Sequence, residues 1–142
     1  MAATEFITHT IEILVEVASE VNNVSVEKAC FSELASYLNR LVPLLKELNK
    51  KDLSNAEKVF VEILNQQVRL AKQLTTECSK KNKVYLLISC RSITKRIQDI
   101  TRETSRALTL IPFSQLQISS TMMQEISQLC EIRHLITSKH SE

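Results

Sequence analysis

The amino-acid sequence predicts an all-α fold, and three observations support that prediction. The 142 residues contain no glycine and two prolines, whereas an average soluble domain of this length holds about ten and about seven. Glycine supplies the positive-φ positions of hairpin turns and phosphate-binding loops, so β-sandwiches, barrels, Rossmann domains and P-loop NTPases are disfavoured. Apolar residues recur at steps of three and four. The composition, 44% hydrophobic and 24% charged, is that of a packed domain.

Two helical segments are expected in the first third of the chain. One runs from about Thr4 to Glu20, and its apolar side is formed by Ile7, Ile11, Leu14, Ala18 and Val21. The next begins near Ser25, and its apolar residues are Phe31, Leu34, Leu38, Leu41, Leu45 and Leu48. Pro43 lies inside this second segment. Because proline lacks an amide donor and its ring crowds the carbonyl of Asn39, a kink is predicted there.

Three more segments follow. The third opens with the capping box Ser54-Asn55-Ala56-Glu57 and ends near Cys78. Its apolar face is Phe60, Ile63, Leu64, Ala71 and Leu74. The fourth follows the polar stretch 79–82 and is stopped by Pro112; its apolar face is Leu86, Cys90, Ile93, Ile97, Ile100, Thr104, Ala107 and Ile111. The fifth starts near Ser120, with Met123, Ile126, Cys130 and Leu135 facing inward.

About five helical segments joined by short polar loops predict an antiparallel helical bundle with a four-helix core, forming a single domain over residues 1–142. The heptad-like spacing of the second and fourth segments also fits a coiled-coil dimer, so helix-mediated self-association stays open. The intramolecular bundle is favoured, because three or more such helices on one chain can bury one another's apolar faces.

Cysteine spacing and the N-terminus indicate a cytoplasmic location. Cys30, Cys78, Cys90 and Cys130 contain no CxxC pair, so a zinc ribbon or a thioredoxin-like motif is not expected and each is interpreted as a small core residue. Glutamates interrupt the N-terminal apolar run, so no signal peptide is expected. The longest unbroken apolar run, Val84 to Ile88, is far shorter than the ~20 residues of a membrane span.

No catalytic residue, cofactor or metal site is predicted. The side chains of Glu5, His9, Glu12 and Glu16 share a helical face and are of metal-binding types, but a solvated acidic stripe is favoured because they lie opposite apolar residues. Cys130 and His134 form an i, i+4 pair that lacks a second pair of ligands. A nucleophile elbow cannot form without glycine. The chain alone is therefore not expected to be an enzyme.

Charge is separated along the chain. Residues 1–27 hold five acids and no Lys or Arg, whereas residues 80–106 hold eight bases and two acids, a local charge of +6. The candidate basic residues for binding lipid or a partner are Lys80, Lys81, Lys83, Arg91, Lys95, Arg102 and Arg106. The candidate acidic partner face is Glu5, Glu12, Glu16 and Glu20. Nucleic acid is not an expected partner, because stacking on bases needs aromatic side chains and the sequence has few of them, two Tyr and four Phe.

The strongest basic feature is on the fourth segment. At 100° per residue, Arg91, Lys95, Arg102 and Arg106 fall within about 60° of one another, opposite the apolar face. Such a strip suits an acidic protein surface or anionic lipid headgroups. The alternative is an ordinary solvated face, partly neutralised by Asp99 and Glu103.

One stretch resembles a known family. The run Cys78-Ser79-Lys80-Lys81-Asn82-Lys83-Val84-Tyr85-Leu86-Leu87, followed by Arg91 and by Ala107-Leu108 shortly before Pro112, resembles the N-terminal domain of plant U-box E3 ubiquitin ligases that carry armadillo repeats. The segment Leu41-Val42-Pro43-Leu44-Leu45 fits as well. The resemblance extends from about residue 6 to residue 136. It is to the senescence- and immunity-associated members of the plasma-membrane type.

This resemblance implies a role in recruitment or regulation. In such ligases the U-box recruits the ubiquitin-charged E2 and the armadillo repeats bind other partners; neither is visible in this chain, which resembles an excised N-terminal domain. The full-length protein would be an E3 ubiquitin transferase, and this domain would dock substrates or regulators. Similar domains are likened to membrane-active four-helix bundles of a pseudokinase and of immune receptors. Two hypotheses therefore stand: a partner-binding module, or a bundle that binds anionic lipids and lies peripherally at the plasma membrane.

Overall fold

Six α-helices and one 3₁₀ turn follow one another in the part of the chain that the computed structural model describes, residues 3–111 and residue 124. They are α1 (Ala3–Glu20), η1 (Val21–Asn23), α2 (Lys28–Asn39), α3 (Val42–Leu48), α4 (Asn55–Lys80), α5 (Lys83–Ile88) and α6 (Cys90–Leu108). These described residues contain no strand, and the predicted all-α class is confirmed. The predicted fifth segment, with Met123, Ile126, Cys130 and Leu135, lies outside the described residues.

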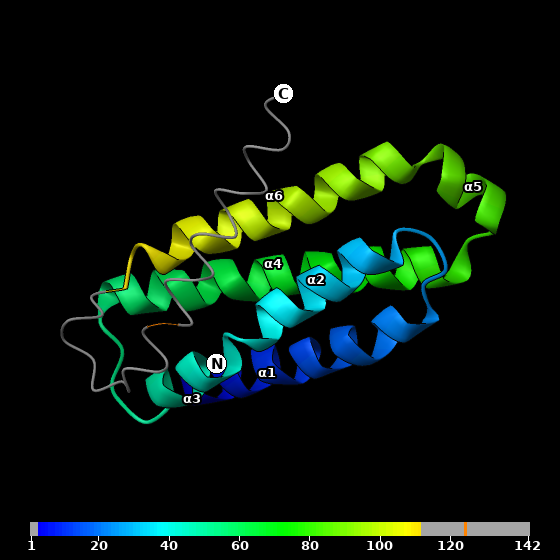
Figure 1. Cartoon of the computed structure of the whole chain (residues 1–142). Helices are drawn as coiled ribbons and strands as arrows, with labels where there is room; N and C mark the ends of the chain where they lie inside the picture. Colours follow the sequence, from blue (N-terminus) through cyan, green and yellow to red (C-terminus); the bar gives the residue numbers. More distant parts are fainter. Residues whose placement is uncertain (1–2, 112–123, 125–142) are drawn as a thin grey trace.

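The long helices alternate in direction along the chain (Figure 1). α1 and α4 run one way, and α2 and α6 run the other way. α4 is the central element, because it packs against both α1 and α6, while α2 packs against α1 and α6. The short helices close the two ends: α3 lies at one end and α5 at the other. The described part is thus a helical bundle, as predicted; its extension over residues 1–142 as a single domain stays a prediction.

The buried face of α1 is rotated from the predicted one. Ile7, Leu14 and Val21 are buried as expected, but Ala18 is exposed and Ile11 is half-buried. The positions that replace them in the core are Thr10, Ile13 and Val17. The polar Thr10 is tolerated there because its hydroxyl donates to the Phe6 carbonyl at 2.9 Å and accepts from the Asn65 side chain of α4 at 2.8 Å. The true packing face of α1 therefore includes a hydrogen-bonded threonine, and apolar periodicity alone does not identify such a residue as buried.

Pro43 coincides with a helix break rather than with the predicted kink. α2 ends at Asn39, Arg40 and Leu41 form a turn, and α3 begins at Val42 with Pro43 in its first turn. In a first turn the missing amide of proline costs nothing, because that amide would have no intrahelical acceptor. All six predicted apolar residues of this segment are buried.

The predicted capping box at the start of α4 is confirmed. The Ser54 hydroxyl accepts from the Glu57 amide at 3.2 Å, and the Glu57 carboxylate accepts from the Ser54 amide at 2.9 Å. The predicted apolar face of α4 is buried except for Ile63, which is half-buried. Among the cysteines, Cys78 is buried as expected, Cys30 and Cys90 are half-buried, and Cys130 is not among the described residues.

The fourth predicted segment is divided in two at Ser89. α5 begins after Asn82, whose side chain accepts from the Tyr85 amide at 2.8 Å, and ends at Ile88. α6 begins at Cys90. The predicted apolar face of this segment is otherwise confirmed, because its residues are buried from Leu86 to Ile111 except for the half-buried Cys90.

Candidate functional site

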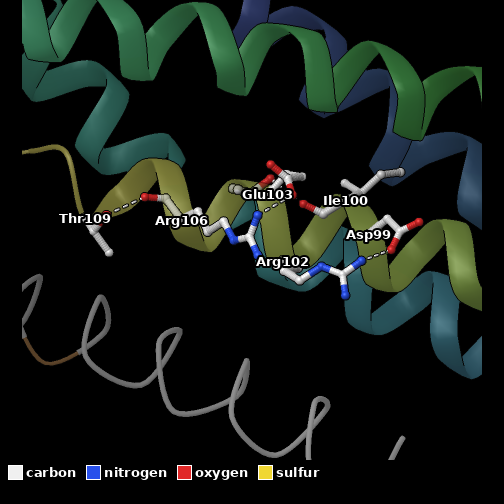
Figure 2. Close-up of polar contacts among 7 residues, drawn as sticks. Asp99, Ile100, Arg102, Glu103, Arg106 and Thr109 are labelled. Atoms are coloured by element: carbon white, nitrogen blue, oxygen red, sulfur yellow. Dashed lines mark hydrogen bonds and ion pairs between the residues drawn. The ribbon is translucent and has the colours of Figure 1, made fainter.

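The basic strip predicted on the fourth segment lies on the exposed side of α6, and its C-terminal half is already paired. Arg102 forms an ion pair with Asp99, and Arg106 forms one with Glu103 at 3.2 Å, each within the same helix (Figure 2). The backbone carbonyl of Arg106, in the last turn of α6, accepts a hydrogen bond from the Thr109 hydroxyl at 2.6 Å (Figure 2). These pairs reduce the positive field of this half of the strip.

The N-terminal half of the strip is different. Arg91 and Lys95 are exposed, and within the described part of the chain neither forms an ion pair. Together with Cys90, Thr94, Gln98 and Glu27 they line a shallow surface cavity of about 500 Å³ between the start of α6 and the N-terminus of α2. The charged side chains that line this depression are thus two bases and one acid, Glu27.

The remaining candidate bases lie at the C-terminal end of α4 and at the start of α5. Lys80 and Lys81 are exposed at the C-terminal end of α4, and Lys83 begins α5. Lys80 and Lys81 also line a groove of about 610 Å³ along α4, with Arg69, Lys72, Gln73, Thr76 and Glu77. The seven predicted bases therefore do not form one continuous strip. They form a neutralised patch, a cavity edge and a cluster at the α5 end of the bundle.

The predicted acidic face of α1 is largely engaged. Glu5, Glu12 and Glu16 are exposed, and Glu20 is half-buried. Glu16 forms an ion pair with Lys72 of α4, Glu20 accepts from the Ser79 hydroxyl at 3.0 Å, and Glu12 lies 3.7 Å from His9. Two of these four glutamates thus help to hold α1 against α4, which leaves a smaller acidic face than the sequence indicates.

The described residues include no cluster of three or more His, Cys, Asp or Glu side chains arranged to hold a metal ion. The pair Cys130 and His134 lies outside them.

The thiols of Cys30 and Cys78 are poorly suited to nucleophilic chemistry, because both have a raised pKa. Burial, the hydrogen bond to Glu27 and the charges of Glu27 and Glu33 raise the pKa of Cys30 to about 11. Burial and Glu77 raise the pKa of Cys78, against the opposite effect of Arg96. Both stay protonated at neutral pH.

One surface feature was missed from the sequence. The four side chains of Val84, Tyr85, Leu87 and Ile88 on α5 are exposed, and the periodicity, which placed only Leu86 of this run on the apolar face, did not single them out as a surface. A signal for this was present, because five consecutive apolar residues cannot all face inward on one helix. No helix in the described part of the chain has the length and apolar character needed to cross a membrane.

Comparisons with known proteins give two relatives. U-box domain-containing protein 13 of Arabidopsis thaliana is 25% identical over 120 residues, covering 80% of this chain and 18% of that protein. U-box domain-containing protein 12 of the same plant is 27% identical over 117 residues, covering 82% of this chain and 18% of that protein. The chain thus spans about a fifth of the length of these relatives. No protein-family profile and no solved structure matches it. The similarity supports a relation to plant U-box proteins.

Proposed function

We propose that this chain is the non-catalytic partner-binding and regulatory domain of a U-box E3 ubiquitin-protein ligase. In this role it recruits substrates or regulators for ubiquitination in plant immunity and senescence signalling. The observation that carries the proposal is the extent of the similarity: about four fifths of this chain matches two proteins named for a U-box, yet the match occupies less than a fifth of each of them. On this proposal the chain corresponds to one module of a longer protein, and ubiquitin transfer belongs to a different module.

The structure supports docking at the start of α6. Arg91 and Lys95 are exposed at the edge of a cavity of about 500 Å³ that Glu27 also lines, and neither base forms an ion pair within the described residues. The backbone beneath them is held by packing, because Ile93 and Ile97 are buried on the opposite side of the same helix. Charged side chains held on a rigid helix suit an acidic segment of a protein partner, since complementary charge increases the rate and specificity of association.

The test compares the wild-type protein and two charge-reversal variants in plant cells. In one, Arg91→Glu and Lys95→Glu reverse the cavity edge. In the control, Lys46→Glu and Lys58→Glu reverse two exposed bases elsewhere, on α3 and α4, and change the net charge equally. Quantitative proximity labelling followed by binding of the purified partners should show at least a tenfold loss for the first variant and little change for the control. Equal partner binding by all three forms would contradict the proposal.

A further inference from the structure

An exposed apolar cluster stands at the end of the bundle where α5 joins α4 to α6 (Figure 1). The exposed fractions are 67% for Val84, 50% for Tyr85, 56% for Leu87 and 81% for Ile88, whereas Leu86 is 1% exposed. The other large apolar side chains that are exposed in the described residues are single residues elsewhere, namely Val15 on α1, Val59 and Leu70 on α4, and Leu110 in the turn after α6. Scattered single residues of that kind are normal on a protein surface, but a contiguous cluster indicates a contact site.

The helical geometry explains why the cluster projects outward. At 100° per residue, the four exposed side chains occupy an arc of about 160° on the side of α5 opposite Leu86. Leu86 anchors the helix in the core, and the Asn82 side chain caps its start by accepting from the Tyr85 amide at 2.8 Å. α5 is therefore fixed in an orientation that presents an apolar surface to its surroundings.

Positive charge flanks this apolar surface on both sides along the chain. Residues 78–98 contain six bases and no acid. Lys80, Lys81 and Lys83 come before the cluster, Arg91 and Lys95 come after it, and all five are exposed. Arg96 is the sixth, and its charge is paired with Glu77 at 3.0 Å. The Lys81 ammonium also lies 5.5 Å from the centre of the Tyr85 ring, which places a base directly beside the apolar surface.

This combination fits the interface of an anionic bilayer. Apolar side chains enter the boundary between headgroups and acyl chains, and flanking Lys and Arg residues meet anionic headgroups. Tyrosine is favoured at that depth because its ring is apolar and its hydroxyl is polar. A hydrophobic groove in a partner protein is a poorer match, because such grooves bind helices whose apolar anchor residues extend over about two turns. α5 has six residues, which is less than two turns.

We propose that α5 and its flanking bases form a membrane-contact site, in which Val84, Tyr85, Leu87 and Ile88 insert into the interface of an anionic bilayer. The bases of this site are Lys80, Lys81 and Lys83, because Arg91 and Lys95 are assigned to the partner-binding cavity edge proposed above. The membrane-contact site does not depend on that proposal. It differs from a strip along α6, because Arg102 and Arg106 at the far end of α6 are paired and take no part in it.

Insertion is tested with a single tryptophan, because the chain contains none. In the Tyr85→Trp variant, vesicles of phosphatidylcholine and phosphatidylserine should shift the emission to shorter wavelength, and spin labels on the acyl chains should quench it. The Val59→Trp variant places the probe on exposed α4 as the control and should show neither effect. Binding without a shift or quenching in Tyr85→Trp would overturn insertion.

Co-sedimentation with the same vesicles tests whether the exposed apolar residues of α5 and the lysines before it are needed for binding. The triple variant Val84→Ser, Leu87→Ser and Ile88→Ser leaves Leu86 in place and should retain its helical circular dichroism, yet bind these vesicles at least about tenfold more weakly. The control is Val15→Ser with Val59→Ser. The variant Lys80→Glu, Lys81→Glu and Lys83→Glu should bind more weakly still, by roughly a hundredfold, because each base contributes about fivefold. Wild-type protein that fails to bind, or that binds equally to vesicles of phosphatidylcholine alone, would overturn the proposal. So would unchanged binding of the triple serine variant, or its loss of a protein partner without any vesicle binding by the wild type.

Discussion

Glu57 shows how a single residue at the start of α4 joins local and tertiary structure. Its side chain is fully buried, and both carboxylate oxygens accept from the Lys51 ammonium at 2.9 Å. Burial by itself raises the pKa of this carboxyl, but the hydrogen bonds from Lys51 and from the Ser54 amide and hydroxyl outweigh that effect and lower the pKa. A carboxyl whose pKa is lower in the folded state stabilises the fold above its unfolded pKa. This stabilisation is lost as the pH falls through the folded pKa.

Glu57→Gln should therefore destabilise the protein in a pH-dependent way. Losing the charge-assisted bonds at a buried position is expected to cost about 1–3 kcal/mol of unfolding free energy at pH 7. The difference from wild type should shrink in acid, below the ordinary glutamate pKa of about 4.3, as the wild-type carboxylate becomes protonated. Urea unfolding at both pH values measures this. A difference that is the same at neutral and acidic pH would contradict the role of the charge; Glu47→Gln, whose partner Lys50 is exposed, is the matched control.

Glu27 is a non-glycine residue in the left-handed region, with φ of 55° at the start of α2. A β-carbon in this conformation costs about 1–2 kcal/mol, and glycine removes that cost while adding entropy to the unfolded chain. Glu27→Gly is therefore expected to raise the unfolding free energy by up to about 1 kcal/mol. Thermal unfolding of Glu27→Gly and Glu27→Ala separates the causes, because alanine retains the β-carbon and should not stabilise. Equal stabilisation by both would show that strain is not the reason.

At the scale of the elements, the break between α2 and α3 sets a test of what Pro43 does. In the first turn of α3 its missing amide is harmless, so Pro43→Ala should change the unfolding free energy by less than about 1 kcal/mol. Lys46 is exposed and lies later in the same helix. Lys46→Pro should cost about 3 kcal/mol, because proline there clashes with the preceding turn and removes an intrahelical bond. Denaturant unfolding of both variants measures these free energies. A large loss of unfolding free energy in Pro43→Ala would contradict the harmless first-turn position and favour the kinked-helix interpretation.

The elements also show which features can be predicted from sequence. The capping box at Ser54 was predictable because both partners lie within one helical turn. The buried face of α1 was misplaced because Thr10 enters the core through a bond to Asn65, which is 55 residues away. Of residues 84–88 the predicted apolar face included Leu86 alone, and Leu86 is the buried residue of that run. The break at Ser89 was not predicted, because the apolar periodicity continues through it from α5 into α6.

The candidate site was predictable in composition and not in arrangement. Seven bases were identified from the sequence, and the structure divides them between paired and unpaired positions. Arg102 and Arg106 have carboxylates three residues before them, a spacing that was visible in the sequence and that favours pairing within a helix. The cavity beside Arg91 and Lys95 was not visible, because Glu27 reaches it from a different part of the chain.

At the scale of the whole molecule, the bundle buries its apolar faces within one chain. α4 packs against α1 and α6, and ion pairs from Lys72 to Glu16 and from Arg96 to Glu77 fasten these three helices together. The alternative, a coiled-coil dimer, would need exposed apolar stripes along the long helices, whereas the apolar residues of α6 are buried. We therefore expect sedimentation equilibrium to give a monomer over a wide concentration range. A concentration-dependent dimer would contradict this expectation.

The two proposed surfaces use different parts of this rigid body. The cavity edge lies between the starts of α2 and α6, and the apolar cluster lies on α5 at the same end of the bundle. On the two proposals, the chain would hold a protein partner at α6 while α5 contacts a membrane. Reversal of Arg91 and Lys95 should therefore affect partner binding far more than the serine substitutions of α5 do.

Recruitment is the central claim, and a reconstituted ubiquitination reaction tests it most directly. A U-box ligase carrying this chain is combined with E1, E2, ubiquitin and a partner identified by proximity labelling. Arg91→Glu with Lys95→Glu should lower ubiquitination of the partner at least about tenfold, as expected for loss of close charge pairs at an interface. Self-ubiquitination of the ligase should stay unchanged, because the catalytic module is untouched. Equal ubiquitination of the partner by both forms would contradict the account.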